Sequence, residues 1–67
     1  MRIDFLPSEW NAFIEHCFFT DRELEIIQLH RRGWAIVDIA AELDISSRTV
    51  DRDIVSIKDK IVDYIKG

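Results

Sequence analysis

The segment Asp38–Ile54, with the sequence DIAAELDISSRTVDRDI, constrains the fold more than any other part of the chain. A short DIS turn separates two stretches in which apolar residues recur at helical intervals. Ala40 is small enough to let two helices cross closely. Apolar residues are spaced to hold the two helices and the turn together, at Ile39, Leu43, Ile45 and Val50. This pattern predicts a helix–turn–helix unit.

A further helix is expected at the start of the chain. In SEWNAFIEHCFF the apolar residues follow one helical stripe, made up of Trp10, Phe13, Ile14, Cys17 and Phe18. Pro7 suits the first turn, where its missing N–H is not needed, and Ser8 is expected to cap the helix. We therefore predict a leading helix over residues 7–19.

The boundary that follows is specified by the sequence FTDREL. The Thr20 hydroxyl can accept from the Glu23 amide while the Glu23 carboxylate accepts from the Thr20 amide, which is a capping box. Phe19 and Leu24 on either side supply a hydrophobic staple. The second helix is expected to continue through DRELEIIQLHRR and to stop at Gly33, where a left-handed residue costs little.

Two more helices complete the predicted unit, which covers residues 20–66. The third lies in WAIVDIAAEL, with Ile36, Ile39, Ala40 and Leu43 facing inward. Ser46 caps the fourth, whose apolar positions continue to the end of the sequence without glycine or proline: Val50, Ile54, Ile57, Ile61, Tyr64 and Ile65. This helix has about 19 residues, longer than the usual ~11–12. The fold class is all-α, as a single small helix–turn–helix domain over residues 1–67.

Composition places the chain in a broad class. Apolar residues make up 48% and charged residues 33%, as in globular proteins, and no apolar run approaches the ~20 residues that span a bilayer. The start, MRIDFLPSEW, lacks the features of a signal peptide, and the single Cys17 excludes an internal disulfide. These features favour a cytoplasmic location. The net charge of −4 argues against strong non-specific DNA binding.

The sequence gives little support for catalysis or metal binding. Only His16, His30 and Cys17 could serve as the nitrogen and sulfur ligands of a zinc ion, which takes about four ligands. There is no glycine-rich loop, and no nucleophile is paired with a base. We therefore expect no enzymatic activity, no cofactor, no metal site and no small-molecule ligand. Trp10, Trp34 and the phenylalanines are interpreted as core residues, with Trp34 partly exposed.

The fourth helix also carries the candidate DNA contacts. On a helical wheel, Arg48 and Arg52 lie opposite the apolar face, with Val55 and Ser56 beside them and Ser47 at the tip. Paired donors of arginine to guanine are the commonest specific base contact. We expect base contacts from Ser47, Arg48, Arg52 and Val55, and phosphate contacts from Arg31, Arg32, Thr49 and Lys58. In the alternative interpretation the two arginines lie on a solvated face and pair with Asp44, Asp51 or Asp59.

Residues 19–61, from FTDREL to SIKDKI, resemble the LuxR-type helix–turn–helix without a gap. The matching positions include Thr20, Arg22–Glu23, Gly33, Ile39–Ala40, Leu43, Ile45–Ser46, Thr49–Val50, Ile57 and Lys60. Region 4 of bacterial sigma factors is similar too, and shares the long uninterrupted last helix. The resemblance implies a sequence-specific double-stranded DNA-binding regulator of bacterial or phage type. The chain departs from the LuxR pattern at Asp51, where the family often has lysine, at Asp53, where it often has histidine, and at Ala35–Val37.

Two questions stay open at the level of sequence. The chain could instead be a protein-interaction module that keeps this scaffold and binds RNA polymerase or another regulator through its acidic surface. Val55, Val62 and Ile65 lie beside the main apolar face of the last helix, while Ile54, Ile57, Ile61 and Tyr64 alternate in spacings of three and four. These residues either pack within the molecule or form a homodimer surface that presents two motifs to adjacent half-sites.

Overall fold

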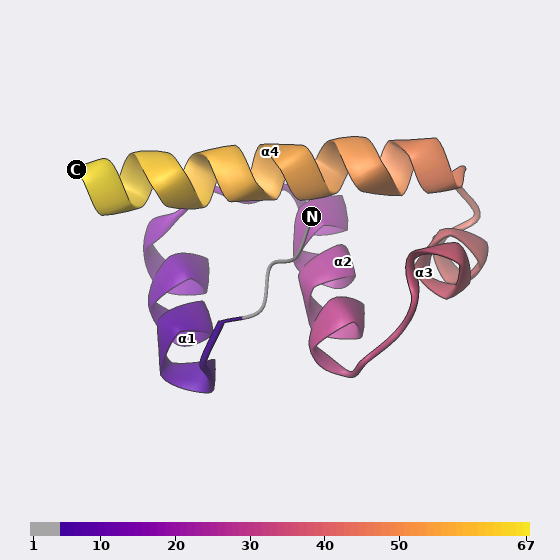
Figure 1. Cartoon of the computed structure of the whole chain (residues 1–67), viewed down its shortest axis with the longest axis horizontal. Helices are drawn as coiled ribbons and strands as arrows, with labels where there is room; N and C mark the ends of the chain where they lie inside the picture. The colour runs from indigo at the N-terminus through magenta and orange to yellow at the C-terminus, as the bar shows by residue number, and fades with distance from the viewer. Residues whose placement is uncertain (1–4) are drawn as a thin grey trace.

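The computed structural model describes residues 5–67, which form four helices joined by short connections (Figure 1). The helices are α1 (Pro7–His16), α2 (Asp21–Arg31), α3 (Ile36–Leu43) and α4 (Ser47–Lys66). No strand occurs in this part of the chain, so the predicted all-α class is confirmed. Residues 1–4, which the predicted domain includes, lie outside the described residues.

The longest helix, α4, organises the molecule. It has 20 residues, and α1, α2 and α3 all pack along one side of it (Figure 1). The core between them is built from Trp10, Phe13, Ile26, Ile27, Ile39, Ala40, Val50, Ile54, Ile57 and Ile61. The four α4 members of this core recur at spacings of three and four, so one stripe of α4 faces the other helices. The opposite face of α4 is left toward solvent.

The predicted boundaries of α2 are present in atomic detail. The Thr20 Oγ1 accepts a hydrogen bond from the Glu23 amide at 3.1 Å, and Glu23 Oε1 accepts from the Thr20 amide at 2.8 Å. Both halves of the capping box are therefore formed. At the other end Gly33 adopts φ +90°, which only glycine accommodates at little cost, and ends the helix.

The leading helix begins at the predicted residue, but its cap and its C-terminal end differ from the prediction. It begins at Pro7 with Leu6 as the N-cap residue, because the residue before a proline favours an extended backbone. Glu9, and not Ser8, completes the first turn by accepting from the Leu6 amide at 2.8 Å. The helix ends at His16, with Cys17 already extended, and the side chain of Phe18 is in the connection with 94% of the residue exposed. The range 7–19 was therefore too long, since residues 17–19 are needed to turn the chain into α2.

A tight turn joins α3 to α4 and fixes where α4 begins. Asp44 adopts the left-handed conformation, with φ 56° and ψ 45°, and the Ile45 amide donates to the Ala40 carbonyl at 3.0 Å. Asp44 is tolerated there because short polar side chains visit this region more readily than branched ones. Ser46 then caps α4 as predicted, with its Oγ accepting from the Thr49 amide at 3.1 Å.

Aromatic contacts attach α1 to the C-terminal turns of α4. The rings of Phe13 and Tyr64 meet edge to face with centroids 6.0 Å apart, and His16 stacks on Tyr64 at 5.5 Å. Ile57 and Ile61 are buried in the same region. The alternating spacing of the α4 isoleucines is thus used for packing inside the molecule. None of the helices within residues 5–67 is long and apolar enough to cross a membrane.

Candidate nucleic-acid interface

The first turn of α4 has the geometry of an anion-binding helix start. Backbone amides at the start of any helix lack an intrahelical acceptor, and at α4 the Ser46 side chain satisfies the Thr49 amide. The amides of Ser47 and Arg48 in the same exposed turn are left for an outside acceptor such as a phosphate oxygen. The Thr49 hydroxyl, which the sequence assigns to phosphate, shares a 2.9 Å hydrogen bond with the Ser46 hydroxyl.

The predicted base-contacting residues lie together on the outward side of α4. Ser47, Arg48 and Arg52 are exposed, and Val55 is 44% exposed on the same side. Within residues 5–67 neither guanidinium is engaged in an ion pair. We call the surface of Ser47, Arg48, Asp51, Arg52 and Val55 the outer face of α4. Its two arginines are available to an outside partner.

The aspartates near these arginines have three different positions. Asp53 points toward α2, where its carboxylate accepts from Arg22 Nε at 2.5 Å and from Arg22 Nη2 at 3.1 Å. This hydrogen bond and the charge of Asp53 raise the pKa of the Arg22 guanidinium. Asp44 forms the left-handed turn before α4. Asp51 alone among the three belongs to the outer face of α4, where it is exposed.

A second charged pair, which sequence reasoning missed, ties α2 to α4 below the surface. Lys60 Nζ lies 2.5 Å from Glu23 Oε1, and only 3% of the Glu23 side chain is exposed. Burial by itself raises the pKa of Glu23, but hydrogen bonds from Lys60, the Thr20 amide and Ser56, with the charge of Lys60, outweigh it, so the net pKa is lowered. Ser56 is therefore half-buried beside Glu23 and not in line with Arg52 on the outer face.

The other predicted phosphate contacts, Lys58, Arg31 and Arg32, do not lie together in the structure. Lys58 is exposed on α4 itself. Arg31 ends α2 and Arg32 is its C-cap residue, whereas the opposite end of α2 carries the contacts of Arg22 and Glu23 with α4. Figure 1 shows α2 running away from α4 toward this C-terminal end. At about 1.5 Å per residue, Arg32 lies roughly 13 Å further along the axis than Glu23.

The proposed dimer residues occupy one flank of α4. Val55 is 44% and Ile65 is 63% exposed, while Val62 is half-buried. Tyr64, which shares the alternating spacing, contacts α1 instead. The flank is therefore a small exposed apolar strip, separate from the core stripe.

Comparison with known protein families identifies the type of domain. The family model for the homeodomain-like domain matches residues 19–54, which is more than half of the chain. The chain belongs to the homeodomain-like family. No curated protein and no solved structure matches it. The family match supports a helix–turn–helix DNA-binding domain, a class that is typically non-enzymatic.

The homeodomain-like match begins at Phe19 and ends at Ile54. It therefore contains α2, α3, the turn at Asp44 and the part of α4 that carries the arginines. The leading helix α1 and the C-terminal half of α4 lie outside it and pack on one another. The matched region is the part that positions the outer face of α4.

Cys17 and the two histidines are dispersed in this homeodomain-like domain. Cys17 is half-buried, with its thiol 3.8 Å from the Lys60 carbonyl, and burial raises its pKa more than Lys60 lowers it. His16 stacks on Tyr64. Among residues 5–67 no group of three histidine, cysteine, aspartate or glutamate side chains is arranged to hold a metal ion. Trp34 is 37% exposed beside Gly33.

Proposed function

We propose that this homeodomain-like domain is a sequence-specific double-stranded DNA-binding transcriptional regulator whose α4 enters the major groove. The observation that carries the proposal is the outer face of α4. It presents Arg48 and Arg52 without ion pairs to any other of residues 5–67, while Asp53 is turned away toward Arg22. An α-helix fits the major groove, and such helices contact base edges through their N-terminal residues.

Each exposed residue has a chemical role in this proposal. Arg48 and Arg52, one turn apart, can each donate two hydrogen bonds to a guanine. Val55 offers methyl groups to the methyl group of thymine, and Ser47 can bond to several bases. Thr49, Lys58 and the free amides at the start of α4 would bind phosphates and set the register of the helix.

The resemblance to LuxR-type domains and to sigma factor region 4 supports a bacterial or phage regulator. Within the proposal, the uninterrupted α4 favours the sigma-like arrangement, because LuxR-type domains usually have a glycine break after this helix. Both families bind DNA through the helix that corresponds to α4. Asp51 stands where LuxR-type domains often have a lysine, and a carboxylate there is repelled by phosphate.

A second copy of the chain would offset this weak attraction. Two motifs bound to adjacent half-sites double the number of phosphate contacts. Val55 cannot lie in the groove and in a dimer contact at once, so association would rest mainly on Val62 and Ile65, of which Ile65 is 63% exposed. Sedimentation at high micromolar concentration should then show a dimer, and a purely monomeric mass would remove this part of the proposal.

Selection from a random library of duplex DNA tests the main proposal. We expect an enriched site containing guanines, and we expect Arg52→Ala to weaken binding to that site by about tenfold to a hundredfold and to relax its base preference. The matched control is Arg32→Ala, which removes the same charge at the far end of α2. Its effect should be under about threefold, since it acts only through the screened long-range field.

The salt dependence of binding gives a second readout. Affinity should fall steeply between low and moderate salt, because each phosphate contact releases counterions. If the folded protein enriches no sequence even at low salt, the DNA proposal fails and the protein-interaction alternative replaces it. Equal losses for Arg52→Ala and Arg32→Ala would contradict the assignment of the outer face of α4.

A further inference from the structure

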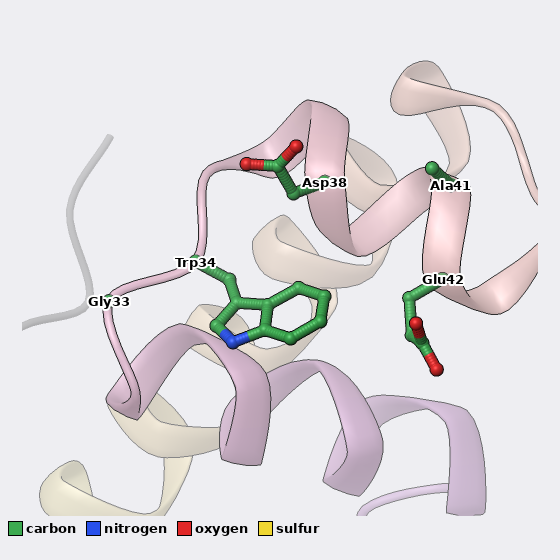
Figure 2. Close-up of a pocket in the computed structure, with 5 residues that line it drawn as sticks. All are labelled: Gly33, Trp34, Asp38, Ala41 and Glu42. Atoms are coloured by element: carbon green, nitrogen blue, oxygen red, sulfur yellow. The ribbon is translucent and has the colours of Figure 1, made fainter.

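Two adjoining hollows lie between α2 and α3. One hollow, of about 600 Å³, is lined by Gly33, Trp34, Asp38, Ala41 and Glu42 (Figure 2). A second, of about 360 Å³, is lined by Glu25, Gln28, Leu29, Glu42 and Leu43. Glu42 lines both hollows, so they adjoin along α3. We call them together the α2–α3 groove.

The groove offers an aromatic and aliphatic surface. Figure 2 shows the Trp34 indole lying between α2 and α3, with the Asp38 side chain above it in this view and the Glu42 side chain to its right. Trp34 is 37% exposed, and Leu29 and Leu43 are only partly buried further along. Large apolar side chains that stay partly exposed in a concave site are typical of a surface that a partner covers.

Among the described residues, the charged ones that line the groove are all acidic. Glu25, Asp38 and Glu42 are exposed, and none of their side chains forms an ion pair or hydrogen bond within residues 5–67. No lysine or arginine between residues 5 and 67 lines either hollow. Asp38 and Glu42 are four residues apart and thus lie one above the other on α3. This arrangement contrasts with Glu23, whose Oε1 already accepts hydrogen bonds from Lys60 and from the Thr20 amide.

We propose that the α2–α3 groove binds a segment of a partner protein in which an arginine stands next to an apolar residue. The guanidinium can stack on the face of the Trp34 indole while its N–H groups donate to Asp38 and Glu42. Arginine fits better than lysine because its planar group combines stacking with paired donation to carboxylates. The apolar neighbour lies against Leu29 and Leu43. Nucleic acid is disfavoured here, because three carboxylates repel phosphate.

The groove and the outer face of α4 can be occupied at the same time. The helices α2 and α3 lie on the inner side of α4, against Val50, Ile54 and Ile57 (Figure 1). Arg48 and Arg52 lie on the other side of that helix. A protein bound to DNA through α4 would therefore keep the groove open to a partner. The groove proposal rests on its own residues and stands whether or not α4 binds DNA.

Nuclear magnetic resonance of the two tryptophan indole N–H groups tests the groove. The probe is a short acetylated peptide of leucine, arginine and alanine, compared with the same peptide carrying citrulline, which is a neutral analogue of arginine. We expect the arginine peptide to shift the Trp34 signal saturably and to leave the signal of Trp10, which is only 2% exposed, in place. The citrulline peptide should bind about tenfold more weakly, because the charge-assisted hydrogen bonds are lost.

Variants separate the groove from general charge attraction. The double substitution Asp38→Asn with Glu42→Gln should weaken the arginine peptide by about tenfold and leave duplex binding unchanged or slightly stronger. Asp59→Asn removes an exposed carboxylate of α4 outside the groove and should leave peptide binding unchanged. If the double variant is not folded by circular dichroism, Glu42→Gln alone should give a loss of several-fold.

Three outcomes would overturn the proposal. The first is equal binding of the arginine and citrulline peptides, and the second is an equal loss from Asp59→Asn. The third is a Trp34 signal that moves with protein concentration in the absence of peptide, which would show that a second copy of the chain occupies the groove. A failure of duplex binding, by contrast, would leave all of these readouts unchanged.

Discussion

The charged side chains between α2 and α4 contrast with those on the outward surfaces of α3 and α4. Between the helices, Arg22 pairs with Asp53 and Lys60 pairs with Glu23. On the outer face of α4 and in the α2–α3 groove, Arg48, Arg52 and the groove carboxylates form no ion pair within the described part of the chain. Four charges thus hold α2 and α4 together, whereas the charges on the outer face of α4 and in the groove are available for binding.

This difference changes what the net charge of −4 means. The total includes Glu23 and Asp53, which are neutralised locally, and the acidic residues of the groove, which lie on another side of the domain. In the proposed complex the duplex would face the outer face of α4, which has two arginines and one aspartate, Asp51. The comparison predicts that charge substitutions between α2 and α4 change stability, whereas those on the two surfaces change binding.

The largest expected effect is on stability, from Lys60→Met. This change leaves the Glu23 carboxylate buried without its counter-charge, and breaking a buried pair in this way costs about 3 kcal/mol. The free energy of unfolding from urea titration measures the loss. Lys66→Met, at the exposed end of α4, is the control and should have almost no effect. Equal effects of the two substitutions would show that the pair does not stabilise the fold.

The pH dependence of stability should identify Glu23 as the titrating member of that pair. Its pKa in the folded protein is lowered from an ordinary value of 4.5, so its contribution is present above that value and is lost as the pH falls through the lowered folded pKa. Glu23→Gln keeps an acceptor for the Thr20 amide but removes the charge. We expect it to cost about 2 kcal/mol at neutral pH and to flatten the decline in unfolding free energy below pH 4.5. An unchanged pH slope would contradict the assignment.

Asp51→Lys tests whether a charge on the outer face of α4 affects DNA binding and not stability. It replaces the single carboxylate of the outer face of α4 by a cation, so duplex affinity should rise by about tenfold at low salt and the salt dependence should steepen by about one phosphate contact. The unfolding free energy should change little because the Asp51 side chain is exposed and has no ion-pair partner among the residues that the structure describes. Asp63→Lys, further along α4, is the control for a general gain of charge. A similar gain from both substitutions would point to non-specific attraction alone.

The smallest expected effect on DNA binding comes from Asp53→Asn. Asp53 is next but one to Asp51, yet its carboxylate faces α2 and only 13% of its side chain is exposed. Loss of the Arg22 pair should lower stability by less than Lys60→Met does, because half of the Arg22 side chain is in solvent. Duplex titration should show almost no change. A gain as large as that from Asp51→Lys would mean that Asp53 faces the DNA.

The features predicted correctly from sequence are those set by neighbours along the chain. The capping box of Thr20 and Glu23, the positive φ of Gly33 and the Ser46 cap each depend on residues within one helical turn. Capping and helix termination depend on residues that are close along the chain and not on tertiary packing, so they can be predicted from the sequence. The spacing of the isoleucines in α4 likewise predicted which face is buried.

What the sequence did not predict depends on how the helices pack. The role of Glu23 as a capping residue is complete within one helical turn, so the sequence around it does not indicate its partner Lys60, 37 positions away. The helical spacing of apolar residues in α1 extends to Phe18 in the sequence. In the structure the chain leaves the helix after His16, because it must reach the Thr20 cap of α2. Arg32 lies beside the predicted motif in sequence but at the far end of α2 in space.

The groove could not be predicted for the same reason. Asp38 and Glu42 look like an ordinary solvated helix face, and Glu25 lies in a different helix. Glu25 and Glu42 line the same hollow only because α2 packs on α3. The second hollow, which Trp34 lines, adjoins it. The crossing of two helices is a tertiary property, set by the side chains that interlock between them.

The central position of α4 also has a consequence for biosynthesis. A ribosome makes α1, α2 and α3 before α4, and each of them packs against α4. Short isolated helices are marginal in water, so the emerging chain has no stable core until α4 has left the exit tunnel. The domain is therefore expected to fold in one late step during or after translation, with its apolar helix faces open to chaperones until then.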